Sequence, residues 1–200
     1  MNLQNIGVIG AGTMGNGIAQ VCALAGFNVT LLDISESALQ KAVATVSKNL
    51  DRQIAKETLT QEQKLAALDK IRTSTDYSNL QNVQLVIEAA TENLELKLRV
   101  LQQIAAQVSD DCVIASNTSS LSITQLAASV SQPERFIGLH FFNPVPVMGL
   151  IEVIRGLQTS DATHALALDM ATTLGKTAIT AGNRPGFVVN RILVPMINEA

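Results

Sequence analysis

The sequence predicts an α/β fold in which helices cover both faces of a doubly wound, mostly parallel sheet. Short apolar runs typical of buried strands alternate with longer segments of helical periodicity along most of the 200 residues. The first apolar run, Ile6–Ile9, leads into a glycine-rich stretch and then into an apolar helical segment. Polar residues follow several later strands, as they do where ligands bind at the carboxyl edge of a parallel sheet.

The glycine-rich stretch has the spacing of a dinucleotide-binding turn, in the order Gly10, Ala11, Gly12, Thr13, Met14, Gly15. The first glycine is expected to make the tight turn, the second to let the backbone approach a pyrophosphate, and the third to let the helix pack closely on the strand. The free N–H groups and the positive dipole end of the helix would face the phosphates. The stretch therefore predicts a Rossmann-type domain with a cofactor on residues 10–15.

An acidic residue ends the second predicted strand, Val29–Asp33, roughly 20 residues after the glycines. A carboxylate at this position accepts hydrogen bonds from a ribose hydroxyl and repels a 2′-phosphate, so Asp33 favours NAD over NADP. The alternative is a glycine-rich turn without a ligand, with Asp33 as the N-cap of the next helix. Strand, glycines and acid are all in register, which favours the NAD site.

Composition excludes several classes of function. A net charge of −3 and a pI near 5.4 argue against a general nucleic-acid binder. No apolar run reaches the ~18 residues that a membrane span needs. The first strand begins so close to Met1 that no signal peptide is expected before it, which favours the cytoplasm.

With 47% hydrophobic but only 3% aromatic residues, the core is expected to be aliphatic.

Cysteines and histidines are few and scattered along the chain. Cys22 and Cys112 are interpreted as small, buried apolar side chains in a reducing compartment. Because neither they nor the histidines cluster, no metal site is expected.

A basic stripe runs along the helix predicted after Ser35, its expected N-cap. Its members recur at helical spacing and share one face: Lys41, Lys48, Arg52 and Lys56. They form either a solvated face or a binding surface for an anionic substrate tail such as the phosphates of coenzyme A. Thr60 is expected to cap a further short helix, which leads to a strand near Ile71–Thr73.

Polar loops follow the next two predicted strands. Val83–Ala89 is followed by the loop Ala90–Asn93 and by a helix with apolar residues from Leu94 to Val108. Val113–Ser116 leads into the polar cluster Asn117–Ser120. The cluster either binds a ligand at the sheet edge or caps the helix that begins near Ile123.

A strand over Phe136–His140 ends at a sharp turn, because Pro144 and Pro146 continue neither a helix nor a central strand. Ile151–Ile154 is the next expected strand. Ser160 is expected to cap a helix that Gly175 ends, and Thr177–Thr180 to form the last strand.

The final residues read as the start of another domain. Pro185 and Gly186 precede an apolar, helical segment that reaches Ala200 without a terminal cap, and such a helix needs a surface to pack on. We expect residues 1–184 to form the Rossmann domain and residues 185–200 to begin an all-α second domain, of which this chain holds only the first helix.

His140 is the candidate base, because it lies where a strand meets a turn at the ligand edge. A dehydrogenase must remove a hydroxyl proton as hydride leaves carbon, and an imidazole that titrates near neutrality suits this step. A turn between two short strands would bring Glu152 close enough to orient the ring. The alternative is a structural histidine, as we interpret His164.

Four segments resemble the short-chain L-3-hydroxyacyl-CoA dehydrogenases, and among them the bacterial 3-hydroxybutyryl-CoA group: Gly10–Gly15, Ser116–Ser120, His140–Met148 and Pro185–Arg191. They span nearly the whole chain in the family's order. The segment His140-Phe141-Phe142-Asn143-Pro144 is far more specific than the glycines.

The resemblance implies a role for each matching residue. His140 resembles the catalytic base, Glu152 the acid that orients it, and Ser119 and Asn190 the groups that hold the substrate's 3-oxygen. Asp33 resembles the residue that binds the adenosine ribose, and the nicotinamide half is matched by Glu92, Lys97, Ser119 and Asn143. Lys56 matches a coenzyme A contact, whereas Asn49 replaces a serine of some members.

The resemblance implies NAD-linked interconversion of a short-chain 3-hydroxyacyl-CoA and its 3-oxoacyl-CoA, in β-oxidation or in butanoate metabolism. It also implies a homodimer formed through the helical second domain, so the activity of this shortened chain by itself is in question. A non-catalytic NAD-binding module and a dehydrogenase of a free hydroxy acid are the alternatives. No basic element for binding DNA is found.

Overall fold

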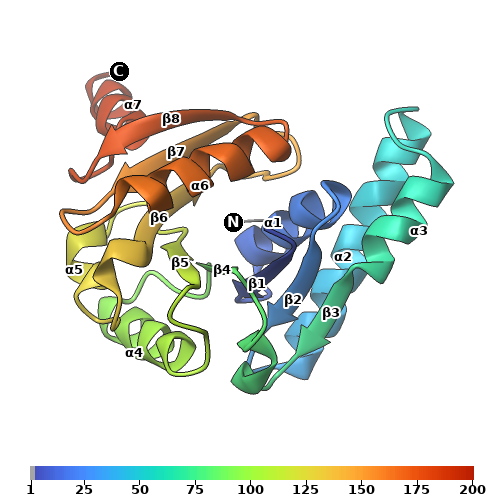
Figure 1. The fold of residues 1–200 in the computed structure, drawn as a ribbon. Coiled ribbons are helices and arrows are strands. Elements are labelled where there is room, and N and C mark those ends of the chain that lie inside the picture. The colour runs from blue at the N-terminus through green and yellow to red at the C-terminus, as the bar shows by residue number, and fades with distance from the viewer. Residues whose placement is uncertain (1–2) are drawn as a thin grey trace.

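The structure, a computed structural model, describes residues 3–200 and arranges their strands in one sheet (Figure 1). The strand order is β3-β2-β1-β4-β5-β6-β7-β8, and among these neighbours only β6 and β7 are antiparallel. The mostly parallel α/β fold is therefore confirmed. The strands are β1 (Asn5–Ile9), β2 (Asn28–Leu32), β3 (Ile71–Ser74), β4 (Leu85–Glu88), β5 (Val113–Ser116), β6 (Phe136–Phe141), β7 (Leu150–Arg155) and β8 (Thr177–Gly182).

Most of the helices begin where short polar side chains cap them. Ser35, Thr60 and Ser160 each accept a hydrogen bond from a backbone N–H of the first helical turn, so the three predicted N-caps are confirmed. Two short 3₁₀ segments, Tyr77–Leu80 and Pro133–Arg135, precede β4 and β6. The helices are α1 (Thr13–Leu24), α2 (Glu36–Ala55), α3 (Gln61–Asp69), α4 (Leu94–Ala105), α5 (Ile123–Ala127), α6 (Asp161–Thr173) and α7 (Val189–Glu199).

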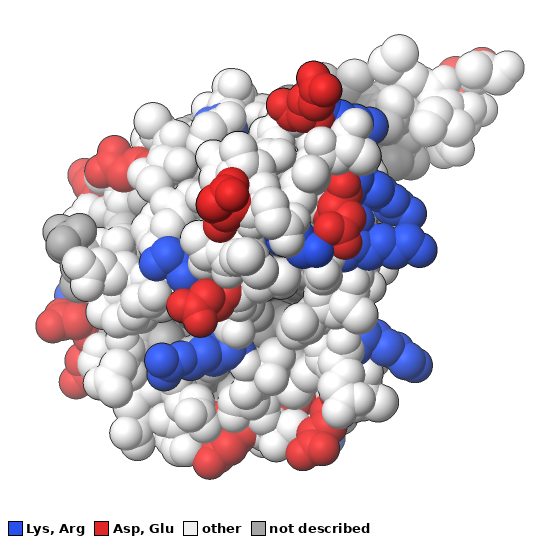
Figure 2. All heavy atoms as spheres, turned by 90° about the vertical axis from the view of Figure 1, so that its right-hand side faces the viewer, with Lys and Arg blue, Asp and Glu red and all other residues white. Residues whose placement is uncertain are grey.

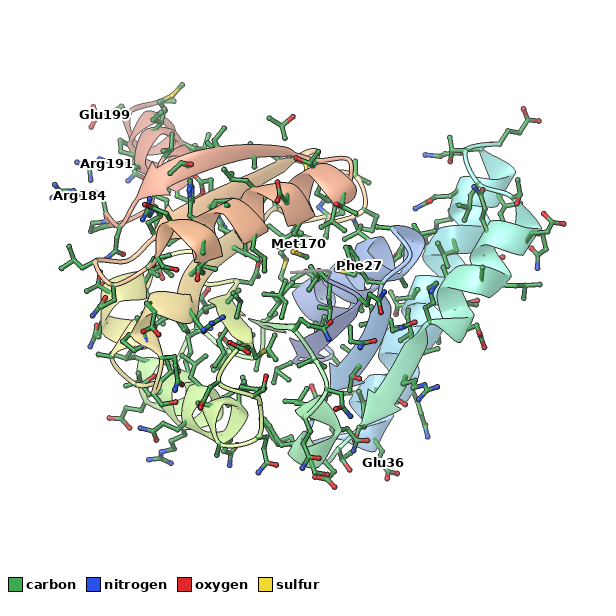
Figure 3. All side chains as sticks on the ribbon, viewed as in Figure 1. Phe27, Glu36, Met170, Arg184, Arg191 and Glu199 are labelled. Atoms are coloured by element: carbon green, nitrogen blue, oxygen red, sulfur yellow. The ribbon has the colours of Figure 1, made fainter. Side chains whose placement is uncertain are left out.

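Two apolar layers cover the two faces of the sheet. One contains buried residues of α1, α2, α3 and α6, and the other contains those of α4 and α5. Phe27, just after α1, and Met170 of α6 lie between these two helices in the first layer, and both are buried (Figure 3). Because successive side chains of one strand point to opposite faces of the sheet, His140 points away from the layer that holds Leu139 and Phe141.

The strand order reverses at β1, which lies between β2 and β4. Right-handed crossovers leave β1 and β4 in opposite directions, which places helices on both faces and opens a crevice at the carboxyl ends of these strands. The glycine stretch, Asp33 and the loop Ala90–Asn93 all lie at this edge, because each directly follows β1, β2 or β4. The fold thus gathers residues from distant parts of the sequence.

One predicted strand is too long, and one of the two alternatives for the polar cluster Asn117–Ser120 is wrong. The expected strand Val83–Ala89 is shorter in the structure, because β4 begins at Leu85 while Val83 packs against the second apolar layer. The polar cluster does not cap α5, since the N-cap of that helix is Ser122, whose hydroxyl accepts from the N–H of Gln125. Within the described residues, no helix is long and apolar enough to cross a membrane.

We predict that Gly138→Ala destabilises the fold two residues before His140. A Cβ atom at Gly138 would lie 2.8 Å from the Cδ1 atom of Ile123 and 2.9 Å from the Cβ atom of Ile154. Overpacking of this kind lowers the free energy of unfolding by about 1–3 kcal/mol, which urea unfolding measures.

The matched control is Gly149→Ala in the loop after β6, where no heavy atom lies within 4 Å of the added Cβ. Its free energy of unfolding is expected to stay near that of the unchanged chain. Equal stability of the two variants would contradict the close packing of α5 on β6.

Candidate active site

The three glycines of the first turn have three different environments. Gly10 has a φ of +98°, which favours glycine and makes the tight turn. A Cβ atom at Gly12 would meet nothing within 4 Å, so the backbone there is open to a ligand. A Cβ atom at Gly15 would lie 1.7 Å from the carbonyl oxygen of Gly10, so only glycine permits the close packing of helix on strand. These are the conformations that the sequence predicted.

The start of α1 is suited to an anion. Its N-cap is Gly12, no side chain caps the helix, and the first turn has no acidic residue. Its free N–H groups and the positive end of its dipole therefore face the open space above Gly12. A pyrophosphate fits this arrangement.

Asp33 lies directly after β2 and is bound to the glycine turn. Its Oδ2 atom accepts from the N–H of Ala11 at 2.7 Å, and its Oδ1 atom accepts from the N–H of Ser35 at 3.0 Å. The alternative in which Asp33 caps the next helix is wrong, because Ser35 is the N-cap of α2. The partly exposed carboxylate is thus held at the cofactor edge, where a ribose would lie.

His140 and Glu152 are partners across the antiparallel β6–β7 pair. The Nδ1 atom of His140 lies 2.7 Å from the Oε2 atom of Glu152, and both side chains are buried. An ionised Glu152 keeps the hydrogen on Nδ1 and leaves the lone pair on Nε2. The ring of Phe142 lies 4.5 Å from the imidazole, centroid to centroid, and that of Phe187 lies 5.7 Å away. The predicted pairing of histidine and acid is confirmed.

The second oxygen of Glu152 binds the start of α7. Its Oε1 atom accepts from the N–H groups of Val188 and Val189, each at 2.9 Å. The carboxylate therefore caps the helix that carries Asn190 and at the same time orients His140. No local motif signals this second contact, because it joins residues more than 30 positions apart.

Glu92 joins the loop after β4 to the polar cluster after β5. Its Oε2 atom accepts from the hydroxyl of Thr118 at 2.7 Å, and its Oε1 atom accepts from the N–H of Ser119 at 2.9 Å. The hydroxyl of Ser119 lies 3.3 Å from the same Oε1 atom. Two of the candidate site residues, Glu92 and Ser119, are thus in direct contact, as expected of loops at neighbouring strand ends.

Lys97 lies beneath the sheet edge rather than on it. Its side chain is 1% exposed, and its ammonium group forms an ion pair with the carboxylate of Glu88. The ammonium also donates to Ser116 at 3.2 Å, and Glu88 accepts from the N–H of Ala90 at 2.9 Å. This buried network fastens α4, β4 and β5 below the loop that carries Glu92. Sequence reasoning missed Glu88, although a charge within the apolar run Val83–Ala89 was a signal that a partner is needed.

Asn143 and Asn190 belong to two segments that flank the His140–Glu152 pair: the turn that follows His140 and the helix whose start binds Glu152. Asn143 is exposed in the turn after β6, and Asn190 is partly buried in the first turn of α7. The end of β6 is held by Asn117, another residue whose role the sequence left undefined, because its Oδ1 atom accepts from the N–H of Phe141 at 2.9 Å.

The basic stripe is exposed along and just beyond α2. Lys41, Lys48, Arg52 and Lys56 are all exposed, and Figure 2 shows lysine and arginine side chains gathered along the right-hand edge of this face. Arg52 donates to Asn49 at 3.4 Å, a contact with an uncharged partner. The geometry agrees with both alternatives, a solvated face and a surface for an anionic tail.

The remaining cysteines and histidine are not reactive groups of this site. Burial raises the pKa of the Cys22 and Cys112 thiols to about 12, so neither is a nucleophile near neutral pH. The Nε2 atom of His164 lies 2.8 Å from the hydroxyl of Thr180, on α6 and β8. Over residues 3–200, no three side chains of the metal-binding types lie close enough to hold an ion.

Comparisons with known proteins agree with the geometry. Residues 5–184 match the family described as 3-hydroxyacyl-CoA dehydrogenase, NAD binding domain. The chain is 48% identical to a 3-hydroxybutyryl-CoA dehydrogenase of Bradyrhizobium diazoefficiens, over 99% of this chain and 68% of that protein. It is 42% identical to the fatty acid oxidation complex subunit alpha of Pseudomonas putida, over 97% of this chain and 27% of that one.

A solved structure shares the fold closely. The (S)-3-hydroxybutyryl-CoA dehydrogenase PaaH1 from Ralstonia eutropha superposes with a TM-score of 0.97 at 59% identity, over 99% of this chain and 70% of that chain. The resemblance carried by the four sequence segments is therefore confirmed.

We predict that two glycine substitutions separate binding from folding. Gly12→Ala is expected to leave the melting temperature unchanged, because the added methyl group meets no protein atom, and to weaken NADH binding about tenfold or more, because it fills the space of the pyrophosphate. Gly15→Ala is expected to lower the free energy of unfolding by about 3 kcal/mol or more, because of the overlap with Gly10.

NADH fluorescence titration and thermal unfolding of both variants make the test. A Gly12→Ala chain that binds NADH as tightly as the unchanged chain would contradict the cofactor position.

Proposed function

Because this chain belongs to the 3-hydroxyacyl-CoA dehydrogenase family, we propose that it interconverts short-chain (S)-3-hydroxyacyl-CoA and 3-oxoacyl-CoA with NAD, as for 3-hydroxybutyryl-CoA and acetoacetyl-CoA. The observation that carries the proposal is the buried His140–Glu152 pair at the carboxyl edge that also holds the glycine turn. A module that only bound NAD would not need an oriented base at this edge.

His140 is the general base of the proposed reaction. Its Nε2 atom takes the proton of the substrate's 3-hydroxyl group, and Glu152 stabilises the imidazolium that forms on the other side of the ring. Bound NAD supplies the acceptor for the hydride that leaves C3. In the reverse direction the imidazolium returns the proton to the 3-oxygen.

Ser119 and Asn190 donate hydrogen bonds to the 3-oxygen in this proposal. Such donors stabilise the charge that develops on the oxygen during proton transfer. The single hydroxyl hydrogen of Ser119 faces Glu92 in the structure, so it must turn by rotation about χ1 or the C–O bond to reach a substrate. Glu152 supports Asn190 indirectly, because it binds the backbone of the two preceding residues.

The cofactor is proposed to lie across the sheet edge. Residues 10–15 hold the pyrophosphate and Asp33 the adenosine ribose, which favours NAD over NADP. Glu92, Ser119 and Asn143 surround the nicotinamide half. Lys97 is assigned to the nicotinamide half as well. It acts there either by contacting the cofactor directly or through its buried contacts with Glu88 and Ser116, which support the loop that carries Glu92.

The coenzyme A tail is proposed to follow the basic stripe, with Lys56 as a contact. Exposed cations there attract the phosphates of the tail, and the free hydroxy-acid alternative would not use them. Asn49, which replaces a serine of some family members, is bound to Gln20 at 3.3 Å, so the tail contacts differ locally from those members.

Domain organisation, assembly and location complete the proposal. We propose that residues 1–184 form the NAD-binding domain and that residues 185–200 begin a helical second domain. In support, α7 has no buried residue, and Ile192, Met196 and Ile197 are each more than half exposed. A homodimer formed through that domain and a cytoplasmic location are part of the same proposal, as is a role in β-oxidation or butanoate metabolism.

The central test is His140→Gln. We expect turnover of acetoacetyl-CoA with NADH to fall by about 10²–10⁴-fold, because the amide cannot accept the proton, while NADH affinity stays unchanged. Glu152→Gln is expected to lose turnover as well, since one amide oxygen cannot serve both His140 and the start of α7. His164→Gln is the matched control and is expected to keep full turnover.

Stopped-flow or steady-state consumption of NADH gives the readout. Turnover of His140→Gln within threefold of the unchanged enzyme would exclude His140 as the base.

The substrate class is tested with Lys56→Met. The KM for acetoacetyl-CoA is expected to rise by roughly threefold at low salt and by less at high salt, because the lost attraction is screened. The kcat is expected to stay the same. Arg72→Met, which removes an exposed charge from β3, is the control and is expected to leave this KM unchanged.

Acetoacetate is compared with acetoacetyl-CoA in the same assay. Equal kcat/KM values for the two compounds would favour the free hydroxy-acid dehydrogenase instead.

A further inference from the structure

Lys176 contacts the loop that follows His140, the candidate base, although Lys176 lies far from this loop in the sequence. It is the last residue before β8, whereas the loop comprises residues 142–149 between β6 and β7. The ammonium of Lys176 donates to the carbonyl oxygen of Val145 at 2.8 Å and to that of Met148 at 2.6 Å. A single side chain therefore binds the loop at two points.

The backbone of the next residue, Thr177, also binds the loop. The N–H of Thr177 donates to the carbonyl oxygen of Gly149 at 2.7 Å, where β8 begins beside β7. Inside the loop, the carbonyl oxygen of Pro144 accepts from the N–H groups of Val147 and Met148. The contacts of Lys176 supply donors for two further carbonyl groups of a segment that has no regular secondary structure.

The other side of the loop rests on the helix that follows the glycine turn. Val145 is 2% exposed, and a Cβ atom added at Gly17 of α1 would lie 2.8 Å from its Cβ atom. The loop is thus held between α1 and Lys176, and its position is defined from both sides. Asn143 lies in this loop two residues before Val145, and its side chain is exposed.

The hydrogen-bond partners of the Lys176 ammonium are carbonyl oxygens of the loop. Across residues 3–200 its ammonium forms no ion pair with a carboxylate, and the side chain is partly buried. Burial lowers the pKa of this lysine, against a smaller opposing influence of Cys22. Hydrogen bonds from an ammonium to carbonyl groups are among the stronger ones, and shielding from water strengthens them.

We propose that Lys176 is a positioning residue for the cofactor, which it serves by fixing the loop 142–149 so that Asn143 meets the nicotinamide half. The inference rests on the proposed function, which assigns Asn143 to that half of NAD. Fixing the loop before binding lowers the ordering cost of the bound state, so the contribution of Lys176 belongs to nucleotide affinity rather than to the chemical step.

The first test is Lys176→Met, which keeps the aliphatic stem and removes the donors. We expect the KM for NADH to rise by roughly threefold to tenfold, with kcat and the KM for acetoacetyl-CoA within about twofold of the original values. Lys176→Arg is expected to recover part of the loss, because the guanidinium keeps the charge and several donors. Lys64→Met, which removes the Lys64–Asp51 ion pair between α2 and α3, is the control and is expected to leave all three constants unchanged.

A double-mutant cycle with Asn143→Ala then tests the route. If Lys176 acts through Asn143, the double variant is expected to bind NADH no more weakly than Asn143→Ala alone. Thermal unfolding of every variant shows which of them are folded at the assay temperature. A purely structural lysine would lower the melting temperature and leave the KM for NADH of the folded enzyme unchanged.

The outcomes separate this inference from the proposed function. An unchanged KM for NADH in Lys176→Met, with a raised KM in Asn143→Ala, overturns the role of Lys176 alone. Additive effects in the double variant overturn the route through Asn143. An unchanged KM in Asn143→Ala contradicts the cofactor contact assigned to that residue, and with it the inference.

Discussion

The carboxylate of Glu152 is the contact on which the arrangement of the site depends, because each of its oxygens has a different partner. One oxygen lies against the imidazole of His140, and the other accepts two N–H groups at the start of α7. The side chain is 0% exposed, so loss of a partner would leave one buried oxygen without its hydrogen bond, at a cost of about 1–3 kcal/mol. His140, the proposed base, and the helix with Asn190 are therefore held in one fixed relation, because the same carboxylate binds both the imidazole and the start of α7.

Carboxylates are used in the same way at the neighbouring strand ends. Glu88 is buried with Lys97 and Ser116 and fastens the end of β4 to α4 and β5. Glu92, in the loop above, accepts from Thr118 and Ser119. Glu88 adds side-chain contacts between two strands that the sheet already pairs, whereas Glu92 joins two loops that the sheet does not pair. The polar edge of the sheet is consequently a connected set of loops, which is what a dinucleotide and a substrate need in order to meet in one geometry.

The two halves of the sheet contribute differently to the site. The half from β1 to β3 presents backbone groups, namely the glycine turn and the uncapped start of α1, with Asp33 bound to Ala11. The half from β4 to β8 presents side chains on strand ends and loops, and the antiparallel β6–β7 pair places His140 directly opposite Glu152. The loop 142–149 connects the halves, since Val145 packs on α1 while Lys176 binds the loop from β8. The residues proposed to bind the nucleotide and those proposed to move the proton thus belong to one continuous framework.

The sequence by itself determined the elements whose cause is local. Hydrophobic periodicity predicted the strands and helices, Ser35, Thr60 and Ser160 predicted helix starts, and glycine spacing predicted the turn, because each signal depends only on neighbouring residues. It also singled out His140 and Glu152 through the turn between them. Only the tertiary structure decided the burial of Lys97 with Glu88, the second partner of Glu152 and the attachment of Lys176 to the loop. These contacts join residues far apart in the chain, and they form because buried charges and unpaired carbonyl groups need partners that only the folded sheet supplies.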